Sequence, residues 1–188
     1  MSRWQPDARG RLEQAALELY TERGFDRTTV AEIADRAGLT ERTFFRHFAD
    51  KREVLFGGQD ALTELLTTHI AQAPESVSPI DAVGRALQAT GEMLEGRREH
   101  ARRRQAVIDA NPGLQERELI KLASLAAAMA EALRRRGVPA SAATLTAETG
   151  VAVFKVAYSR WLGAGRRKDL TRVIGDSLDE LKALTASP

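Results

Sequence analysis

The sequence predicts an all-α protein, with three short helices at the N-terminus and a larger helical domain behind them. Apolar residues recur three or four positions apart along nearly the whole chain, which is the spacing of one helix face. Ser, Thr, Asp or Asn stands before several of these runs, as helix N-caps do. No segment alternates apolar and polar residues in the way that predicts a strand. We therefore expect about nine helices and no sheet.

The first two helices follow from apolar spacing and from a capping pattern. The first helix ends near Gly24. The second begins at Val30, because Thr29 can cap it and Glu32, three residues later, completes a capping box. The residues expected on the buried faces of these helices are Leu12, Ala15, Ala16, Leu19, Tyr20, Val30, Ile33, Ala34 and Ala37.

A tight turn and a third helix complete this head. Gly38 supplies the turn, and Thr40 can cap a short helix that runs to about His47. Two short helices joined by a turn containing Gly form a helix-turn-helix, whose second helix enters the DNA major groove. The segment from Thr28 to Leu55 therefore predicts a DNA-binding head.

One set of residues in this head matches a known family in both order and spacing. The set is Gly24-Phe25, Thr28-Thr29-Val30, Ile33-Ala34, Ala37-Gly38-Leu39-Thr40, Thr43, His47-Phe48 and Lys51. In these residues the chain resembles the N-terminal domain of tetracycline-repressor-type (TetR) regulators. The resemblance implies an all-helical homodimer whose three-helix head binds a palindromic operator. It also implies a helical C-terminal domain that dimerises and binds a small molecule, which releases the DNA. We place the two domains at residues 1–56 and 57–188.

The third helix and its surroundings carry the residues expected to contact DNA. These are Thr28, Thr29, Thr40, Glu41, Arg42, Thr43, Phe45, Arg46, His47 and Lys51. Arg42 could bind the O6 and N7 atoms of a guanine. It could instead be a solvated side chain that pairs with Glu41 or Glu22. Glu41 could accept a hydrogen bond from cytosine N4, or it could only repel phosphates.

Phe45 departs from the pattern that the resemblance implies. Family members usually carry Tyr at this position, and its hydroxyl contacts a phosphate. Phe45 keeps the packing but loses that bond, so with Phe48 it is expected to hold the third helix to the head. The expected anchors of the DNA backbone are then His47, Thr28, Thr29 and Lys51. The last two also lie at helix N-termini, where free N–H groups favour phosphate.

A long helix is expected to begin at Asp50, which forms a capping box with Glu53. Its apolar face would carry Leu55, Leu62, Leu66 and Ile70. Gly57-Gly58 falls inside this helix, where each Gly costs about 1 kcal/mol relative to Ala. The pair indicates either a bend between head and body or a close helix packing.

Four further helices follow, with a basic stretch between the first and the second of them. They run from Ser78-Pro79 to about Gly96, from Asn111-Pro112 to Gly137, from about Ala140 to Leu162, and from Leu170 to Leu184. The basic stretch, Arg97 to Arg104, is either a solvated face or a site for an anionic head group. The helix from Ala140 is apolar on several sides, so it must be covered on several sides.

Composition limits the function classes. Hydrophobic residues make up 43% and charged residues 29% of the 188, and 28 Lys and Arg face 26 Asp and Glu, so bulk charge does not indicate nucleic acid. There is no cysteine, secretory signal or long apolar run, so we expect a cytoplasmic protein without disulfides or a membrane span. His69 and His100 stand alone, and no catalytic set or metal-ligand cluster is evident. We therefore expect no enzyme, metal or cofactor.

The C-terminal domain is expected to hold an apolar pocket. Its lining would be Leu62, Leu66, Leu87, Arg104, Val107, Leu122, Met129, Phe154 and Tyr158, although ordinary core packing explains any one of them. Such a pocket predicts a hydrophobic or amphipathic effector. The segment from Val107 to Leu133 is similar to the C-terminal class of mycofactocin-type regulators. That resemblance implies an acyl-CoA-like ligand.

Dimerisation is expected through the last two helices, which would form a four-helix bundle with the partner's copies. The expected interface residues are Val153, Val156, Arg160, Ile174, Leu178 and Leu181. Two-fold symmetry lets two identical heads bind an inverted repeat in double-stranded DNA. The predicted function is a ligand-responsive transcriptional repressor. The alternative is a constitutive dimeric DNA-binding protein without an effector, and a filled apolar core would favour it.

Overall fold

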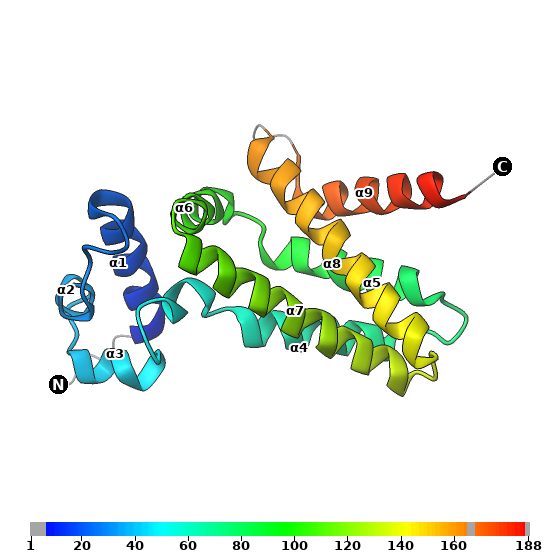
Figure 1. The fold of residues 1–188 in the computed structure, drawn as a ribbon, viewed down its shortest axis with the longest axis horizontal. Helices are drawn as coiled ribbons and strands as arrows, with labels where there is room; N and C mark the ends of the chain where they lie inside the picture. The colour runs from blue at the N-terminus through cyan, green and yellow to red at the C-terminus, as the bar shows by residue number, and fades with distance from the viewer. Residues whose placement is uncertain (1–6, 165–167, 187–188) are drawn as a thin grey trace. The chain divides into compact units, whose positions relative to one another are not determined.

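The computed structural model describes residues 7–164 and 168–186. Within these residues the chain forms nine α-helices, one short 3-10 helix and no strand, which confirms the all-α class (Figure 1). The N-terminal elements are α1 (Ala8–Arg23), α2 (Val30–Arg36), α3 (Glu41–His47) and the 3-10 helix η1 (Glu53–Phe56). The later helices are α4 (Gln59–Gln72), α5 (Pro79–Met93), α6 (Arg98–Asp109), α7 (Pro112–Arg135), α8 (Ala140–Gly163) and α9 (Leu170–Thr185).

The chain divides into two compact units. The first contains the chain up to Gly58 together with His100–Glu118, and the second contains Gln59–Glu99 and the chain from Leu119 onward. The first unit therefore holds most of α6 and the start of α7 in addition to the three-helix head. Residues 100–118 fall within the range 57–188 that is expected for the second domain, but they belong to the first unit.

A single hydrophobic core holds the first unit together. Leu12 from α1, Ile33 from α2 and Phe44 from α3 are fully buried in it. Val107 and Ile108 of α6 belong to the same core. Because burial of a large apolar side chain contributes about 1.5–3 kcal/mol, these contacts make α6 an integral part of the unit that carries α3.

Two arginines add polar links between η1 and the segment 100–118. Arg104 Nε donates to the carbonyl oxygen of Leu55 at 2.6 Å, and its guanidinium lies 5.1 Å from the centroid of the Phe56 ring. Arg117 pairs with the carboxylate of Glu53, with an Nη2–Oε1 distance of 2.5 Å. The end of the head is thus attached to α6 and α7 by both charge and packing.

The helix expected from Asp50 is not continuous, and that prediction was wrong. Asp50 does act as a cap, since its Oδ1 accepts from the N–H groups of Arg52 and Glu53. However, these bonds reach only the start of the four-residue η1, whose N-cap position is Arg52, and α4 begins at Gln59, after Gly57 and Gly58. The two glycines therefore lie between two helices and not inside one.

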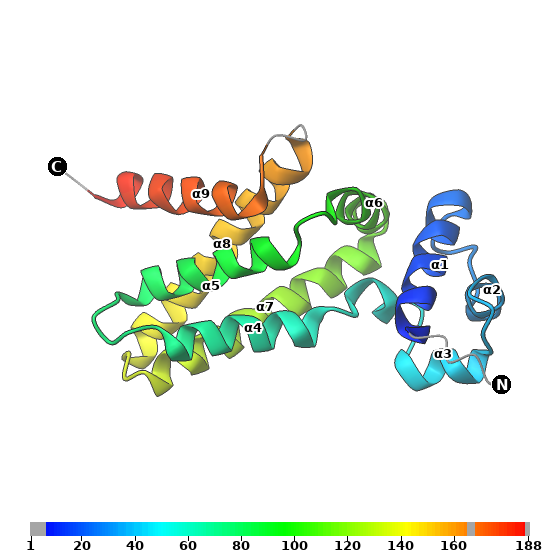
Figure 2. The same ribbon diagram turned by 180° about the vertical axis from the view of Figure 1, so that it is seen from behind.

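Within the second unit, α5 occupies the central place. It packs against α4, α8 and α9, and α8 also packs against α9 (Figure 2). Glycines let these helices approach closely: a Cβ atom at Gly84 would collide with Leu178 of α9, and one at Gly150 would press on Val83 of α5. α5 begins as expected, with Ser78 as its cap and Pro79 in its first turn.

Candidate nucleic-acid interface

The capping box expected before α2 is present. Thr29 Oγ1 accepts from the N–H of Glu32 at 3.2 Å, and Glu32 Oε2 accepts from the N–H of Thr29 at 2.9 Å. The Glu32 carboxylate also accepts from the Thr29 hydroxyl at 2.9 Å, and the two bonds that Thr29 donates to this carboxylate lower the Glu32 pKa, with the bond from the backbone N–H as the largest cause. The position of α2 is therefore fixed locally by two residues that the sequence singles out.

The turn between α2 and α3 depends on Gly38 and on a residue of α1. Gly38 has a φ of +64°, a conformation that favours glycine. Arg11 of α1 donates to the carbonyl oxygens of Ala37 and Gly38. Thr40 then caps α3 by accepting from the N–H of Thr43 at 3.2 Å. These contacts set the direction in which α3 leaves the turn. Local sequence patterns do not predict the role of Arg11, which depends on a contact across 26 residues of chain.

The apolar face of α3 is formed by Phe44 and Phe48, which are 0% and 4% exposed. The expectation that Phe45 would hold the helix to the head was wrong, because the Phe45 side chain is 55% exposed. Phe48 follows the last residue of α3 with an extended backbone, and its ring packs 5.5 Å from that of Phe44. Spacing alone does not distinguish Phe44 from Phe45, because residues three and four positions before Phe48 are equally possible neighbours of it.

The opposite side of α3 presents charged groups to solvent. Glu41, Arg42 and Arg46 are exposed, and within the described part of the chain neither arginine has an ion-pair partner. Glu22, one proposed partner for Arg42, instead binds Arg36 at 3.0 Å, and hydrogen bonding to Arg36 lowers the Glu22 pKa. The structure thus leaves both guanidinium groups available to a ligand.

Two of the expected backbone anchors have other roles in this structure. Thr28 is fully buried, and its hydroxyl donates to the carbonyl oxygen of Gly24 at 2.9 Å. The ammonium of Lys51 donates to the carbonyl oxygens of Phe25, Asp26 and Thr28. The side chain of Thr28 therefore cannot reach a phosphate, and the ammonium of Lys51 already has three acceptors.

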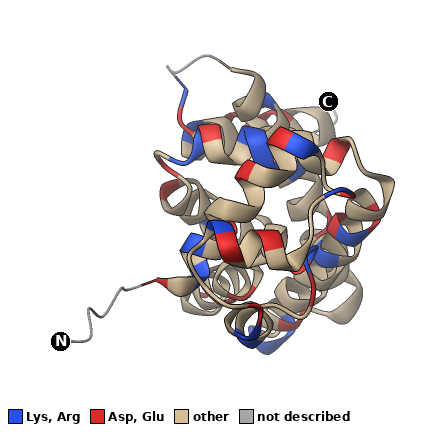
Figure 3. Cartoon of the chain, turned by 90° about the vertical axis from the view of Figure 1, so that its left-hand side faces the viewer, with Lys and Arg blue, Asp and Glu red and all other residues tan. Residues whose placement is uncertain are grey.

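His47 and Thr29 remain as candidate anchors beside α3. The Nε2 atom of His47 is buried and has no hydrogen-bond partner among the described residues. Thr29 is exposed, as are Thr40 and the charged residues of α3, while Thr43 is half-buried. Basic and acidic residues are interspersed in the ribbon of Figure 3. Any affinity for a polyanion must then depend on the placement of individual charges.

The expected lining of the apolar pocket is divided between the two units. Leu66, Leu87 and Met129 are fully buried in the second unit, where Leu62, Leu122, Phe154 and Tyr158 are half-buried. The Phe154 and Tyr158 rings stack with centroids 5.6 Å apart. Val107 and Arg104, by contrast, belong to the first unit, where Arg104 also pairs with Glu118 at 3.2 Å. Arg104 is therefore a structural link and not a free cation.

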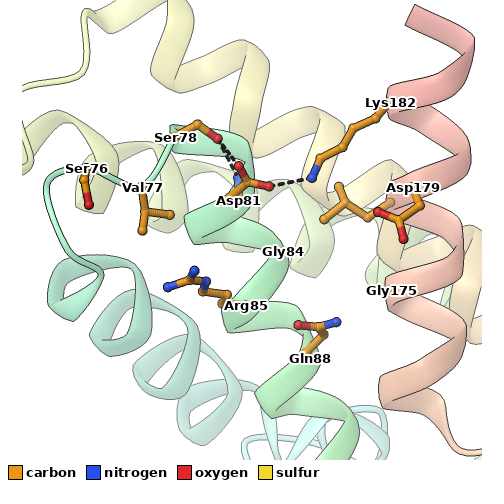
Figure 4. A pocket seen from close by; sticks show the side chains of 11 residues that line it. Ser76, Val77, Ser78, Asp81, Gly84, Arg85, Gln88, Gly175, Asp179 and Lys182 are labelled. Carbon is orange, nitrogen blue, oxygen red and sulfur yellow. Dashed lines mark hydrogen bonds and ion pairs between the residues drawn. The ribbon is translucent and has the colours of Figure 1, made fainter. Parts of the chain in front are cut away.

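A hollow of about 470 Å³ lies between α5 and α9, and it is polar (Figure 4). Asp81 on α5 pairs with Lys182 on α9 at 2.5 Å and also accepts from Ser78, which together lower the Asp81 pKa. Arg85 and Asp179 line the same hollow. None of the residues expected to line an apolar pocket lies here.

The expected dimer residues divide into buried and exposed ones. Val153, Ile174 and Leu178 are buried within their own chain, so their assignment to the surface of a partner was wrong. Arg160 pairs with Glu180 of α9 at 2.6 Å. Val156 is 47% exposed and Leu181 is half-buried. Of the expected apolar interface residues, Val156 is thus the most available to a partner.

Residues 7–164 and 168–186 contain neither a membrane-spanning helix nor a cluster of metal ligands. No helix in these ranges combines the length and apolar character needed to cross a bilayer. No three His, Cys, Asp or Glu side chains there lie together as metal ligands.

In the basic stretch, Arg98 lies 5.1 Å over the Trp161 ring and donates to the carbonyl oxygens of Ala164 and Lys168.

Comparison with known proteins relates both parts of the chain to regulators. Residues 13–56 match the family model of bacterial regulatory proteins of the tetR family, and residues 77–186 match the model of the MftR C-terminal domain. A candidate mycofactocin biosynthesis transcriptional regulator, MftR of Mycobacterium tuberculosis, is 28% identical over 182 residues, which cover 92% of this chain and 88% of that protein.

Two further proteins resemble the chain in part or in fold. The transcriptional regulator TcmR of Streptomyces glaucescens is 36% identical over 89 residues, which cover 47% of this chain but only 39% of TcmR. The structure of FadR from Thermus thermophilus, a TetR-family repressor in complex with lauroyl-CoA, has a TM-score of 0.58 at 23% identity and covers 96% of each chain. The chain therefore belongs to the tetR family of bacterial regulatory proteins, and it is a transcriptional regulator with a C-terminal domain of the MftR class.

Proposed function

We propose that this regulator is a dimeric repressor that binds an inverted-repeat DNA operator through α3 and is released by an amphipathic small molecule. The observation that carries the proposal is the exposed side of α3, where neither Arg42 nor Arg46 has an ion-pair partner among the residues that the structure describes. The buried Phe44 and Phe48 hold that helix in place. Family membership agrees with the expectation that the chain regulates transcription and is not an enzyme.

Arg42, Arg46 and two nearby residues have specific roles in this proposal. Arg42 binds guanine through O6 and N7, since this bidentate pair is the commonest specific contact in the major groove. Arg46 and Thr29 bind phosphates, and His47 donates a ring N–H to a phosphate beside them. Two heads related by a two-fold axis bind the two half-sites of one palindrome.

Selection from a random DNA library tests the DNA-binding part of the proposal. Purified protein is mixed with random double-stranded DNA, and bound fragments are amplified and sequenced over several rounds. The expected result is enrichment of an inverted repeat whose half-sites contain a guanine. A final pool without any enriched sequence would contradict the proposal.

The effector is proposed to be acyl-CoA-like or similarly amphipathic. Two findings support this class: the match to the MftR C-terminal domain and the fold shared with a repressor that binds lauroyl-CoA. Titrating lauroyl-CoA into a labelled operator complex tests it. Release at micromolar ligand supports the effector, whereas a complex that resists acyl-CoAs of every chain length supports the constitutive alternative.

A further inference from the structure

Phe45 is an exposed aromatic residue on the helix that is proposed to enter DNA. Among the described residues of α1, α2 and α3 it is the only large apolar side chain that is exposed to solvent. The other exposed large apolar side chains lie on later helices and are Met93, Leu119, Ile120, Leu145, Val156 and Leu184. Isolated exposed apolar side chains are common on proteins, so the position of Phe45 decides its meaning.

The Phe45 ring has a defined orientation. It lies edge-on to the ring of Phe44, with centroids 5.4 Å apart and an interplanar angle of 82°. Phe44 is fully buried, so the surface against which Phe45 rests is rigid. An aromatic side chain with few rotatable bonds loses little entropy when it makes a further contact.

Phe45 also lies beside the proposed base-reading residue. It follows Arg42 by three positions, and residues three apart are neighbours on one side of a helix. Arg42 and Phe45 therefore present one cationic and one apolar group side by side. Phe45 has no hydroxyl, so it cannot form a hydrogen bond to a phosphate or to a base edge.

We propose that Phe45 recognises a thymine in each half-site by contact with its C5-methyl group. That methyl is the apolar group which base pairs present in the major groove, and Phe is among the side chains that contact it. Three residues of helix advance about 4.5 Å, against about 3.4 Å for each base of a strand. The thymine therefore lies one or two base pairs from the guanine bound by Arg42. The inference rests on the proposed function, and it adds a specificity that the charged residues cannot supply.

Replacement of thymine by deoxyuridine tests this contact, because it removes the methyl group and changes nothing else in the base pair. Each thymine of the selected operator is replaced in turn, in both half-sites together, and the dissociation constant is measured for each duplex. At one position, removal of the methyl weakens wild-type binding by about threefold to fivefold per half-site.

Two variants decide whether Phe45 is responsible. Phe45→Ala binds the thymine and deoxyuridine operators equally at that position, since the contact is already missing. Arg46→Ala, a neighbour on the same helix, binds more weakly overall but keeps the full methyl effect. Thermal unfolding of Phe45→Ala remains close to wild type because the side chain is exposed in the free protein.

The failures of the two proposals are distinguishable. Sequence-specific binding that is indifferent to every thymine methyl overturns the role of Phe45 alone. A methyl effect that survives in Phe45→Ala also overturns it and assigns the contact to another residue. A protein that enriches no operator overturns the proposed function and this inference with it.

Discussion

The ammonium nitrogen of Lys51 lies 2.9 Å from the carbonyl oxygen of Thr28. The same nitrogen donates to the carbonyl of Phe25 at 2.9 Å and lies 4.4 Å from the centroid of the Phe25 ring. Tyr20 donates its hydroxyl to the Lys51 carbonyl at 2.6 Å, and burial raises the pKa of that hydroxyl. Lys51 therefore connects the loop before α2 to the segment after α3. These contacts help to position α3 within the head.

Replacing Lys51 by methionine should reduce the stability of the protein. Lys51→Met keeps the aliphatic stem but removes the ammonium that donates to three carbonyl groups, of which that of Phe25 keeps a bond from the N–H of Thr28. Hydrogen bonds from charged groups contribute about 1.5–3 kcal/mol, so we expect a loss of that size in the free energy of unfolding. Denaturant unfolding measures it. A stability within 0.5 kcal/mol of wild type, which is about the scatter of ordinary surface changes, would contradict the structural role.

The salt dependence of DNA binding separates Lys51 from a true phosphate contact. Removing one phosphate contact reduces the slope of log affinity against log salt by about one. Arg46→Ala should show this reduction while keeping wild-type stability, because Arg46 is exposed and has no ion-pair partner among the described residues. Lys51→Met should keep the wild-type slope. A reduced slope for Lys51→Met with an unchanged slope for Arg46→Ala would show that Lys51 binds a phosphate.

Arg42→Ala should relax base preference at a single operator position. The expected cost is about 1–3 kcal/mol with the preferred base pair there, and much less with the other three. Binding is measured on a set of operators that differ only at that position. If the variant loses the same affinity on all four duplexes, Arg42 does not read a base.

Val156→Asp should convert the dimer into monomers and abolish operator binding. Val156 is 47% exposed on α8, so a charged residue there leaves the core of its own chain undisturbed. In a dimer interface the same carboxylate would be buried without a partner, which costs free energy and opposes dimerisation. Leu119→Asp is the matched control, since Leu119 is 58% exposed on α7. Light scattering should give a monomer for the first variant and a dimer for the second. A dimeric Val156→Asp would exclude this face.

Gly58→Ala should blunt release by an effector while leaving operator affinity within a few fold. A Cβ atom at Gly58 meets open space, so the variant restricts only the backbone where the chain passes from one unit to the other. At Gly57 a Cβ atom would displace the end of the Glu13 side chain and crowd the buried Phe48 ring at 3.3 Å, so Gly57→Ala should also disturb packing in the head. Titration of lauroyl-CoA against the operator complex checks the first variant. Release identical to wild type would exclude a hinge at Gly58.

Local signals in the sequence predicted the helices of the head well. The capping box of Thr29 with Glu32 and the cap at Thr40 need only residues three positions apart, and both are present. The same rule failed at Asp50 because a cap specifies where a helix starts and not how long it continues. Gly57 and Gly58 lie at the break between η1 and α4, whereas the expected helix would have contained them.

Contacts between distant residues could not be predicted in this way. A lysine that follows a helix-turn-helix is as consistent with phosphate binding as with the three carbonyls that Lys51 contacts across 23 to 26 residues of chain. The attachment of α6 to the head likewise depends on Arg104 and Val107 meeting residues some fifty positions earlier. Periodicity identifies which side of a helix is apolar, but it does not identify the helix that covers it.

The central claim is that two copies of α3 bind two half-sites of one inverted repeat, and operator spacing tests it most directly. Five base pairs inserted between the half-sites rotate them by about half a turn of DNA, since a turn takes about 10 to 10.5 base pairs. We predict that wild-type protein loses at least about a hundredfold in affinity, as expected when only one half-site can be bound. Equal affinity for the original and lengthened operators would contradict the account.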